Sequence, residues 1–201
     1  LVYMDKMQDE VNILSTTGDH TGYLGENNDE AYLEANSGDI QVFGESGNDE
    51  IVAQNSGSDT LDGGNDDDYI VVLPGSVGRK VLIGGFGDDE IEVADSSGNA
   101  SMQILPNTQA EVSGGEGDDV IRYYRGVFIT DSNNGGADGD RLVINGPTIL
   151  TLRDKSIENI ETVEFSDDDS VIFADGNNVK DADGNDGDDY LDASRETSSG
   201  Y

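Results

Sequence analysis

Aspartates that follow glycine-rich segments recur along much of this chain of 201 residues. Two segments, GGFGDDEIE from Gly84 and GGEGDDVIR from Gly114, fit the pattern G-G-x-G-x-D-x-U-x, in which U is apolar. Glycine adopts turn conformations that other residues avoid and leaves backbone carbonyls exposed, while the aspartate supplies a carboxylate. Hard oxygen donors of these two kinds are what Ca²⁺ prefers. The chemistry predicted for these segments is therefore calcium binding in turns.

The other copies of the pattern depart from it. Glu45, Asp66 and Asp138 replace expected glycines, and Asn185 does so in the last copy. We predict that the sixth position of each copy supplies a metal-binding carboxylate, from Asp29, Asp39, Asp49, Asp59, Asp68, Asp89, Asp119, Asp140 and Asp189. Further metal-binding oxygens are expected from Gly44, Gly47, Gly63, Gly84, Gly87, Gly114, Gly117, Gly135 and Gly184. The competing hypothesis is that these segments are tight turns that bind no metal.

The spacing of the aspartates predicts how the turns are stacked. Most steps between them are close to ten, twenty or thirty residues, which indicates half-turns of about ten residues and coils of about twenty. Two files of ligands should result, one on each edge of the coil. The first is expected to contain Asp29, Asp49, Asp68 and Asp89, and the second Asp39, Asp59, Asp119 and Asp140. Arg79 falls in the second file, where a cationic side chain should interrupt calcium binding.

Strands must hold these turns in register. Apolar residues recur at the second and fourth places after the aspartates, a period of two that is typical of strands with one buried face. The pairs are Ile51 and Ala53, Ile70 and Val72, Ile91 and Val93, Ile121 and Tyr123, Leu142 and Ile144, and Leu191 and Ala193. We therefore predict an all-β fold, a parallel β-roll or β-helix solenoid with calcium ions stacked in its turns.

The composition is consistent with a protein that needs cations. The formal charge is −34, from 44 acidic and 10 basic residues, and only 34% of the residues are hydrophobic. Such a chain repels itself, so bound positive charge is expected to help it fold. The alternative explanation of the charge is a solvated, salt-adapted surface.

The same composition excludes several classes of function. Nucleic acid is excluded as a main partner, because it requires a basic surface. The chain has no cysteine and one histidine, His20, so thiolate or imidazole metal sites and Ser-His catalysis have almost no residues to use.

We expect four parts along the chain. Residues 1 to 24 should be an N-terminal cap or a degenerate first coil, and residues 25 to 146 the calcium-binding solenoid. Residues 147 to 180 have few repeats, and their strands should either continue the solenoid or pack on it. Residues 181 to 201 hold the last repeat and the tail. The segment from Asp181 to Asp192 also resembles an EF-hand loop, although its sixth and twelfth residues are Asp186 and Asp192 instead of Gly and Glu.

No basic and apolar leader follows Leu1, and no apolar run approaches the length of a membrane span. We therefore expect a chain without a membrane span. It should be either a fragment or a protein whose export signal does not lie at this end.

The repeats GGFGDDEIE and GGEGDDVIR resemble those of RTX (repeats-in-toxin) proteins, a family of secreted bacterial proteins. The resemblance extends, with gaps, from Gly25 to Asp192. It implies a right-handed parallel β-roll that folds on binding several Ca²⁺ ions, export by type I secretion machinery, and an extracellular or cell-surface location. Parent proteins in this family include toxins, proteases, lipases, adhesins and surface-layer proteins.

Three functions are considered. The leading hypothesis is a non-catalytic module that stays extended in a calcium-poor cytosol and folds at millimolar calcium outside the cell. The second is an adhesin or surface-layer segment that binds glycan or protein. The third is a β-helix polysaccharide lyase or epimerase, whose basic residues would be Arg122, Arg125 and Arg141.

Overall fold

A computed structural model shows the protein as a stack of parallel β-strands. The structure describes residues 2–3, 8–14, 17–34, 38–73, 75–76, 78–93, 108–124, 133–137, 139–145, 149–152, 157–158, 160, 162–165, 170–173, 181–183 and 190–192. No helix occurs in these ranges, and every strand pairing in them is parallel. The prediction of an all-β solenoid of parallel strands is confirmed.

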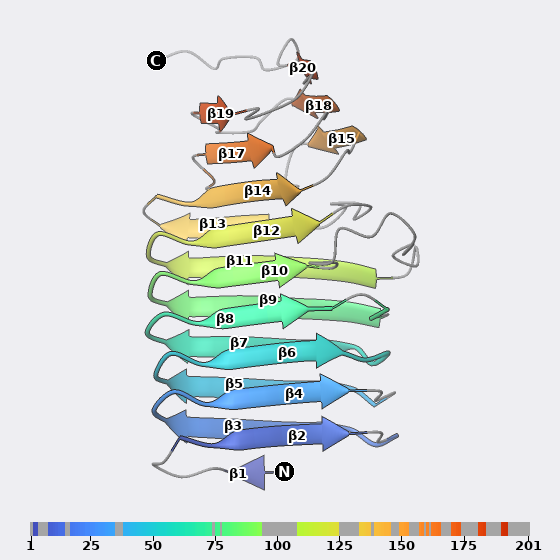
Figure 1. Cartoon of the computed structure of the whole chain (residues 1–201), viewed down its shortest axis with the longest axis vertical. Helices are drawn as coiled ribbons and strands as arrows, with labels where there is room; N and C mark the ends of the chain where they lie inside the picture. Colours follow the sequence, from blue (N-terminus) through green and yellow to red (C-terminus); the bar gives the residue numbers. More distant parts are fainter. Residues whose placement is uncertain are drawn as a thin grey trace.

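Most strands belong to two large sheets. The first contains, in order, β1 (Val2–Tyr3), β3 (His20–Glu26), β5 (Ile40–Ser46), β7 (Asp59–Asn65), β9 (Gly78–Phe86), β11 (Thr108–Glu116), β13 (Asn133–Ala137) and β16 (Ile157–Glu158). The second contains β2 (Glu10–Leu14), β4 (Glu30–Glu34), β6 (Glu50–Gln54), β8 (Tyr69–Val72), β10 (Glu90–Val93), β12 (Val120–Tyr124), β14 (Arg141–Asn145), β17 (Thr162–Phe165) and β19 (Asp181–Asp183). From β2 to β14 the chain alternates between the sheets, so each coil adds one strand to each (Figure 1).

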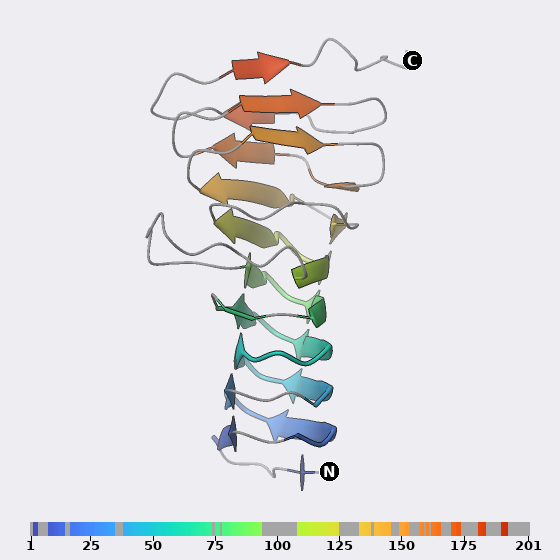
Figure 2. The same ribbon diagram turned by 90° about the vertical axis from the view of Figure 1, so that its right-hand side faces the viewer.

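The strand register keeps equivalent residues of successive coils side by side. In the second sheet Ile51 pairs with Ile70, Ile70 with Ile91, and Ile91 with Ile121. Parallel strands lie about 4.8 Å apart, so the turns that precede these strands are stacked at the same spacing. Figure 2 shows the two large sheets as separate layers along the length of the stack.

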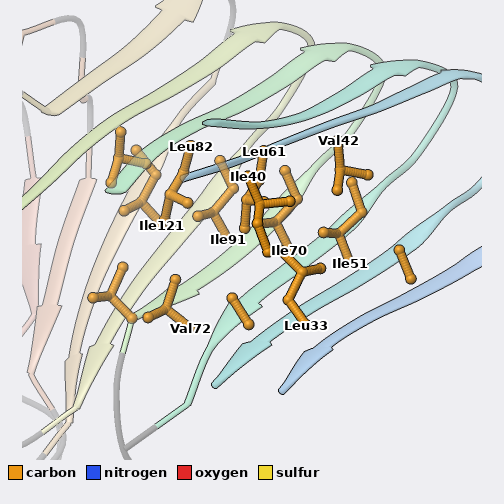
Figure 3. Packing of buried hydrophobic residues seen from close by; sticks show 14 of the residues in the cluster. Leu33, Ile40, Val42, Ile51, Leu61, Ile70, Val72, Leu82, Ile91 and Ile121 are labelled. Carbon is orange, nitrogen blue, oxygen red and sulfur yellow. The ribbon is translucent and has the colours of Figure 1, made fainter. Parts of the chain in front are cut away.

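The core lies between the two layers. Leu33, Ile51, Ile70, Ile91 and Ile121 from one sheet are at most 1% exposed. They meet the buried side chains of Ile40, Val42, Leu61 and Leu82 from the other sheet (Figure 3). The predicted inward positions are confirmed for Ile51, Ala53, Ile70, Val72, Ile91, Val93, Ile121 and Leu142. The side chains of Tyr123, Ile144, Leu191 and Ala193 lie outside the described part. Each fully buried Leu or Ile contributes about 1.5–3 kcal/mol, so this narrow core supplies much of the stability.

Both ends of the chain add strands to the same architecture. At the N-terminal end, β2 and β3 pair with β4 and β5, so these two strands already belong to the stack. In the repeat-poor part, β16 and β17 extend the two large sheets. A third sheet joins β15 (Ile149–Leu152), β18 (Ser170–Phe173) and β20 (Tyr190–Asp192). The two ends of the EF-hand-like segment, Asp181 and Asp192, belong to strands of different sheets. This contradicts the EF-hand interpretation, which requires flanking helices.

No helix among the described residues is long and apolar enough to cross a membrane.

Candidate metal site

The turns between the two sheets have an unusual backbone. In the turn that holds the full motif from Gly84, the second and fourth residues are left-handed, with φ of 131° at Gly85 and 133° at Gly87. Glu45 and Asp66 stand at positions where the motif expects glycine, and they keep left-handed φ angles of 77° and 75°. Left-handed backbone costs a residue with a side chain roughly 1–2 kcal/mol. The glycine positions of the motif therefore require a left-handed backbone. The copies that carry Glu45 and Asp66 at these positions adopt it at a cost in stability.

Six sixth-position aspartates form a continuous ladder inside the solenoid, here called the inner ladder. Its members are Asp29, Asp49, Asp68, Asp89, Asp119 and Asp140, each at most 3% exposed. Oδ1 of each accepts a hydrogen bond from the backbone N–H of the equivalent residue in the preceding coil. The N to O distances run from 2.6 Å between Asp9 and Asp29 to 3.0 Å between Asp119 and Asp140. One carboxylate oxygen per coil therefore stabilises the stacking of the turns.

The fifth positions form a second, exposed file, here called the outer ladder. Its carboxylates are Asp67, Asp88 and Asp118, and Asn28 is its first member. Here Oδ1 accepts from the backbone N–H of the following coil, for example from Asp88 to Asp67 at 3.0 Å and from Asp118 to Asp88 at 3.0 Å. The two ladders thus connect adjacent coils in opposite directions.

The second carboxylate oxygen of the inner-ladder aspartates, Oδ2, has a different environment from Oδ1. Oδ2 of Asp29, Asp49, Asp68, Asp89 and Asp119 is buried and has no hydrogen-bond partner. A buried polar atom without a partner costs about 1–3 kcal/mol, and more when it is charged. The repetition of the same atom in five successive coils points to a ligand that the protein chain does not itself supply.

The electrostatics of the inner ladder also favour a counter-charge. Burial raises the pKa of Asp49 to about 7, of Asp68 to about 8, of Asp89 to about 7 and of Asp119 to about 6. The backbone N–H bonds to Oδ1 act in the opposite direction, and neighbouring carboxylates raise the pKa further. A fully ionised ladder is therefore unfavourable near neutral pH unless cations or protons balance it.

In four of these turns the first residue of the motif is a glycine that lies against Oδ2. A Cβ added to Gly84 would overlap Oδ2 of Asp89 and the carbonyl oxygen of Gly114 in the next coil. A Cβ on Gly114 would likewise overlap Oδ2 of Asp119 and the carbonyl oxygen of Gly135. Gly44 has the same relation to Asp49, and Gly63 to Asp68. Carboxylate and carbonyl oxygens therefore lie close together beside a residue that needs to be glycine.

This donor set fits Ca²⁺, which accepts carboxylate and backbone carbonyl ligands. Among the described residues no three carboxylate, imidazole or thiolate side chains converge on one point. Backbone carbonyls would therefore have to provide much of the coordination. The stacked glycines offer them, since a Cβ on Gly47 would overlap the carbonyl of Asn27, and one on Gly117 that of Gly87.

The predicted division into two files was wrong for Asp119 and Asp140. Asp119 follows Asp89 in the inner ladder, because its Oδ1 accepts the N–H of Asp89 at 2.9 Å and Glu90 pairs with Val120. Asp140 continues the same file. The coil from Asp89 to Asp119 is about ten residues longer than its neighbours, and the additional residues fall between β10 and β11. Ten additional residues equal half a coil, so counting along the sequence assigns Asp119 to the opposite edge. In the structure the chain returns to the same edge.

On the other edge the structure places Asp39 and Asp59 differently from each other. Asp39 is exposed and accepts the N–H of Ser58 at 2.9 Å. Asp59 lies in register with Ile40, whose N–H donates to Asp59 Oδ1 at 3.0 Å. The coil here is one residue shorter, and a shift of one residue in a strand turns the side chain to the opposite face. Asp59 is therefore buried, at 2% exposure, and is not stacked with Asp39 as predicted.

The cation on this edge is Lys80, which the sequence analysis missed. Its side chain is fully buried, and its Nζ lies 2.6 Å from Asp59 Oδ2 and 3.0 Å from Asn55 Oδ1. Arg79, predicted to interrupt the file, is the residue before it. The signal in the sequence was the alternation of Lys80, Leu82 and Gly84, which places Lys80 on the inward face. Because both oxygens of Asp59 have protein partners, we leave Asp59 out of the candidate metal site.

Two predicted site residues, Asp189 and Gly184, lie outside the described residues, and so does Arg125. The other arginines of the lyase hypothesis form ion pairs across strands. Arg122 lies 2.5 Å from Glu90 and 3.2 Å from Glu92, and Arg141 lies 2.6 Å from Glu164. These contacts give the two arginines a role in balancing charge between neighbouring strands.

Comparison of the chain with protein-family models, with curated proteins and with solved structures found no match.

Proposed function

We propose that the protein is a calcium-binding repeat module of the RTX type, part of a secreted bacterial protein, which folds on binding several Ca²⁺ ions outside the cell. The observation that carries this proposal is the row of buried Oδ2 atoms without partners in five successive turns. The resemblance of the repeats from Gly84 and Gly114 to RTX repeats supports the choice of calcium over other cations.

The ligands would be the inner-ladder carboxylates together with backbone carbonyls of the glycine-rich turns. When bound, calcium supplies positive charge where the stack otherwise concentrates negative charge. The chain contributes the arrangement: Oδ1 is held by the neighbouring backbone, so Oδ2 is fixed at the glycine turn. A Ca²⁺ site shared by two coils links the stability of each coil to that of the next.

This arrangement suits a switch between compartments. Extracellular calcium modules bind at about 10⁻⁴ to 10⁻³ M, above the calcium level of a cytosol. Near neutral pH and without ions, a chain with a charge of −34 and a narrow core would be largely unfolded, in a form suited to export by type I secretion machinery. We further propose that the module is not itself catalytic, and that it serves as a scaffold at or outside the cell surface.

The test is a calcium titration followed by circular dichroism, starting from protein treated with chelator. The expected result is a cooperative gain of strand signal with a midpoint of about 10⁻⁴ to 10⁻³ M calcium. Magnesium at the same concentrations is the control, and it should have little effect because it requires smaller, octahedral sites. An equal strand signal with chelator and with calcium would contradict the proposal.

A further inference from the structure

The cluster around Lys80 has a composition that an ordinary buried ion pair does not need. It contains an amine, an amide and a carboxylate, from Lys80, Asn55 and Asp59, and these residues are 0%, 3% and 2% exposed. Asn55 directly follows β6, whereas Lys80 lies in β9 of the other sheet. The three groups therefore meet inside the solenoid, shielded from solvent.

The contacts place each group in a chemically distinct position. Lys80 Nζ lies 3.0 Å from Asn55 Oδ1, 2.6 Å from Asp59 Oδ2, and within hydrogen-bonding distance of the carbonyl of Gly57. Asp59 Oδ1 is held by the N–H of Ile40. Asn55 Nδ2 is buried and has no hydrogen-bond partner. Because the Asn55 amide serves only as an acceptor, its Nδ2 donor stays unsatisfied in a buried position, which is unfavourable.

We propose that Lys80 and Asn55 form an intramolecular isopeptide bond, with Asp59 as the group that moves the proton. Lys80 Nζ, as the free amine, attacks Cγ of Asn55. The C–N bond from Cγ to Nδ2 breaks, ammonia leaves, and a secondary amide joins Nζ to Cγ. No oxidant, reductant or cofactor is required.

The proton transfers balance within the cluster. Asp59 Oδ2 accepts a proton from the Lys80 ammonium, which yields the nucleophilic amine, and its carboxyl group then donates that proton to the departing nitrogen, which leaves as ammonia. Nζ loses a second proton when the amide forms, and the same carboxylate passes it to the released ammonia, which becomes ammonium. The carboxylate is restored and the net change is loss of one ammonium. Burial lowers the pKa of Lys80, while Asp59 opposes that shift, so the amine form is more accessible than in water. Holding the reactants together without solvent replaces a bimolecular step by an intramolecular one.

The bond would join the turn after β6 to β9 of the next coil. It closes a loop from residue 55 to residue 80, so it limits the freedom of the unfolded chain in the manner of a disulfide, which this chain without cysteine cannot form. This inference does not depend on calcium binding, except that the protein must be folded for the groups to meet.

The experiment is the intact mass of the full chain, folded at millimolar calcium and then denatured. The expected mass is lower than that of the sequence by one ammonia, and a digest should contain a peptide in which Asn55 is joined to Lys80. A folded protein of full mass would overturn the proposal and leave an ion pair only. Loss of one water instead would also overturn it, because Asp59 would then be the acceptor.

Variants separate this reaction from other losses of ammonia. Succinimide formation at Asn134-Gly135 or Asn145-Gly146 also releases ammonia, but it does not need Lys80. Lys80→Met should therefore restore the full mass, and Lys6→Met, the matched control, should keep the lower mass. Asp59→Ala should also have the full mass while circular dichroism shows it folded. Persistent loss of ammonia in Lys80→Met would overturn the proposal.

Discussion

At the scale of single residues, adjacent carboxylates in one turn have different tasks. Asp88 is exposed and its Oδ1 accepts from the next coil, whereas Asp89 is buried and its Oδ1 accepts from the previous coil. Oδ2 of Asp89 is buried without a hydrogen-bond partner, whereas the Asp88 side chain is exposed to solvent. The proposed calcium response should therefore depend on which of the two carboxylates is changed.

We predict that Asp89→Asn weakens the calcium response and that Asp88→Asn changes it little. Asparagine keeps Oδ1 as an acceptor but removes the charge, so Asp89→Asn should also make the calcium-free protein easier to fold. The expected shift in the calcium midpoint is about tenfold, which corresponds to about 1.4 kcal/mol. Titrations of the two variants in parallel check this. Equal shifts in both would show that surface charge, and not the inner ladder, governs the response.

A second residue-scale prediction concerns the left-handed positions. Glu45→Gly should stabilise the calcium-loaded protein by about 1 kcal/mol, because Glu45 has φ of 77° and glycine tolerates that conformation. The control is Ser46→Gly, one residue further in β5, which should destabilise by roughly 0.5–1 kcal/mol. Denaturant unfolding of both variants measures the difference. A loss of stability in Glu45→Gly would mean that the Glu45 side chain makes a contribution larger than the strain.

At the scale of elements, the inner ladder ties the stability of the stack to pH. The pKa of Asp49, Asp68 and Asp89 is raised from 3.8 to about 7, 8 and 7, mainly by burial. In the absence of calcium, the folded protein therefore binds more protons than the unfolded chain between the ordinary pKa of 3.8 and the raised values of about 7 to 8. Stability should be fully present near pH 4 and should be lost as the pH rises toward about 8.

We predict that the chelator-treated protein unfolds more easily at pH 8 than at pH 5, with each released proton contributing about 1.4 kcal/mol per pH unit. Calcium should reverse the trend, since its ligands are deprotonated carboxylates. Asp68→Asn should reduce the slope and Asp67→Asn, in the outer ladder, should not. Thermal unfolding at several pH values measures this. Calcium-free stability that increases from pH 5 to pH 8 would contradict the assignment.

The core between the sheets makes a separate prediction. Ile91 is fully buried, so Ile91→Ala should destabilise the protein by about 2–5 kcal/mol. Phe86 lies nearby in the same coil but is 56% exposed, so Phe86→Ala should change the stability by no more than about 0.5 kcal/mol. Unfolding by denaturant at saturating calcium compares them. Equal losses would indicate that Phe86 is covered by another surface in solution.

The sequence predicted the strands and the stacking of the first four aspartates of the inner ladder well, because the period of two and the glycine turns are local signals. It failed where the coil length changes. Ten residues added between Asp89 and Asp119 look like half a coil, and one residue removed before Asp59 turns that side chain inward. Lys80 was missed for the same reason, since its partner Asp59 had been predicted as a metal ligand stacked with Asp39. Pairing between coils is a tertiary property, and periodicity alone does not determine it.

At the scale of the whole molecule, the fold is a one-dimensional stack. Its buried core stabilises the compact state, and its negative charge destabilises it. The narrow interior gives each coil a few buried Ile, Leu and Val side chains, while a charge of −34 favours expansion. In such a solenoid each coil is stabilised mainly by its neighbours. Ions placed along the inner ladder would add attraction at every interface between coils, so folding and calcium binding should be one cooperative process.

The most direct measurement is anomalous X-ray diffraction from crystals grown with calcium. We predict a row of anomalous peaks beside Oδ2 of Asp49, Asp68 and Asp89, repeating at about 4.8 Å along the stack, the spacing of the strands. Peaks confined to the outer ladder, or an inner ladder without any peak at saturating calcium, would contradict the account.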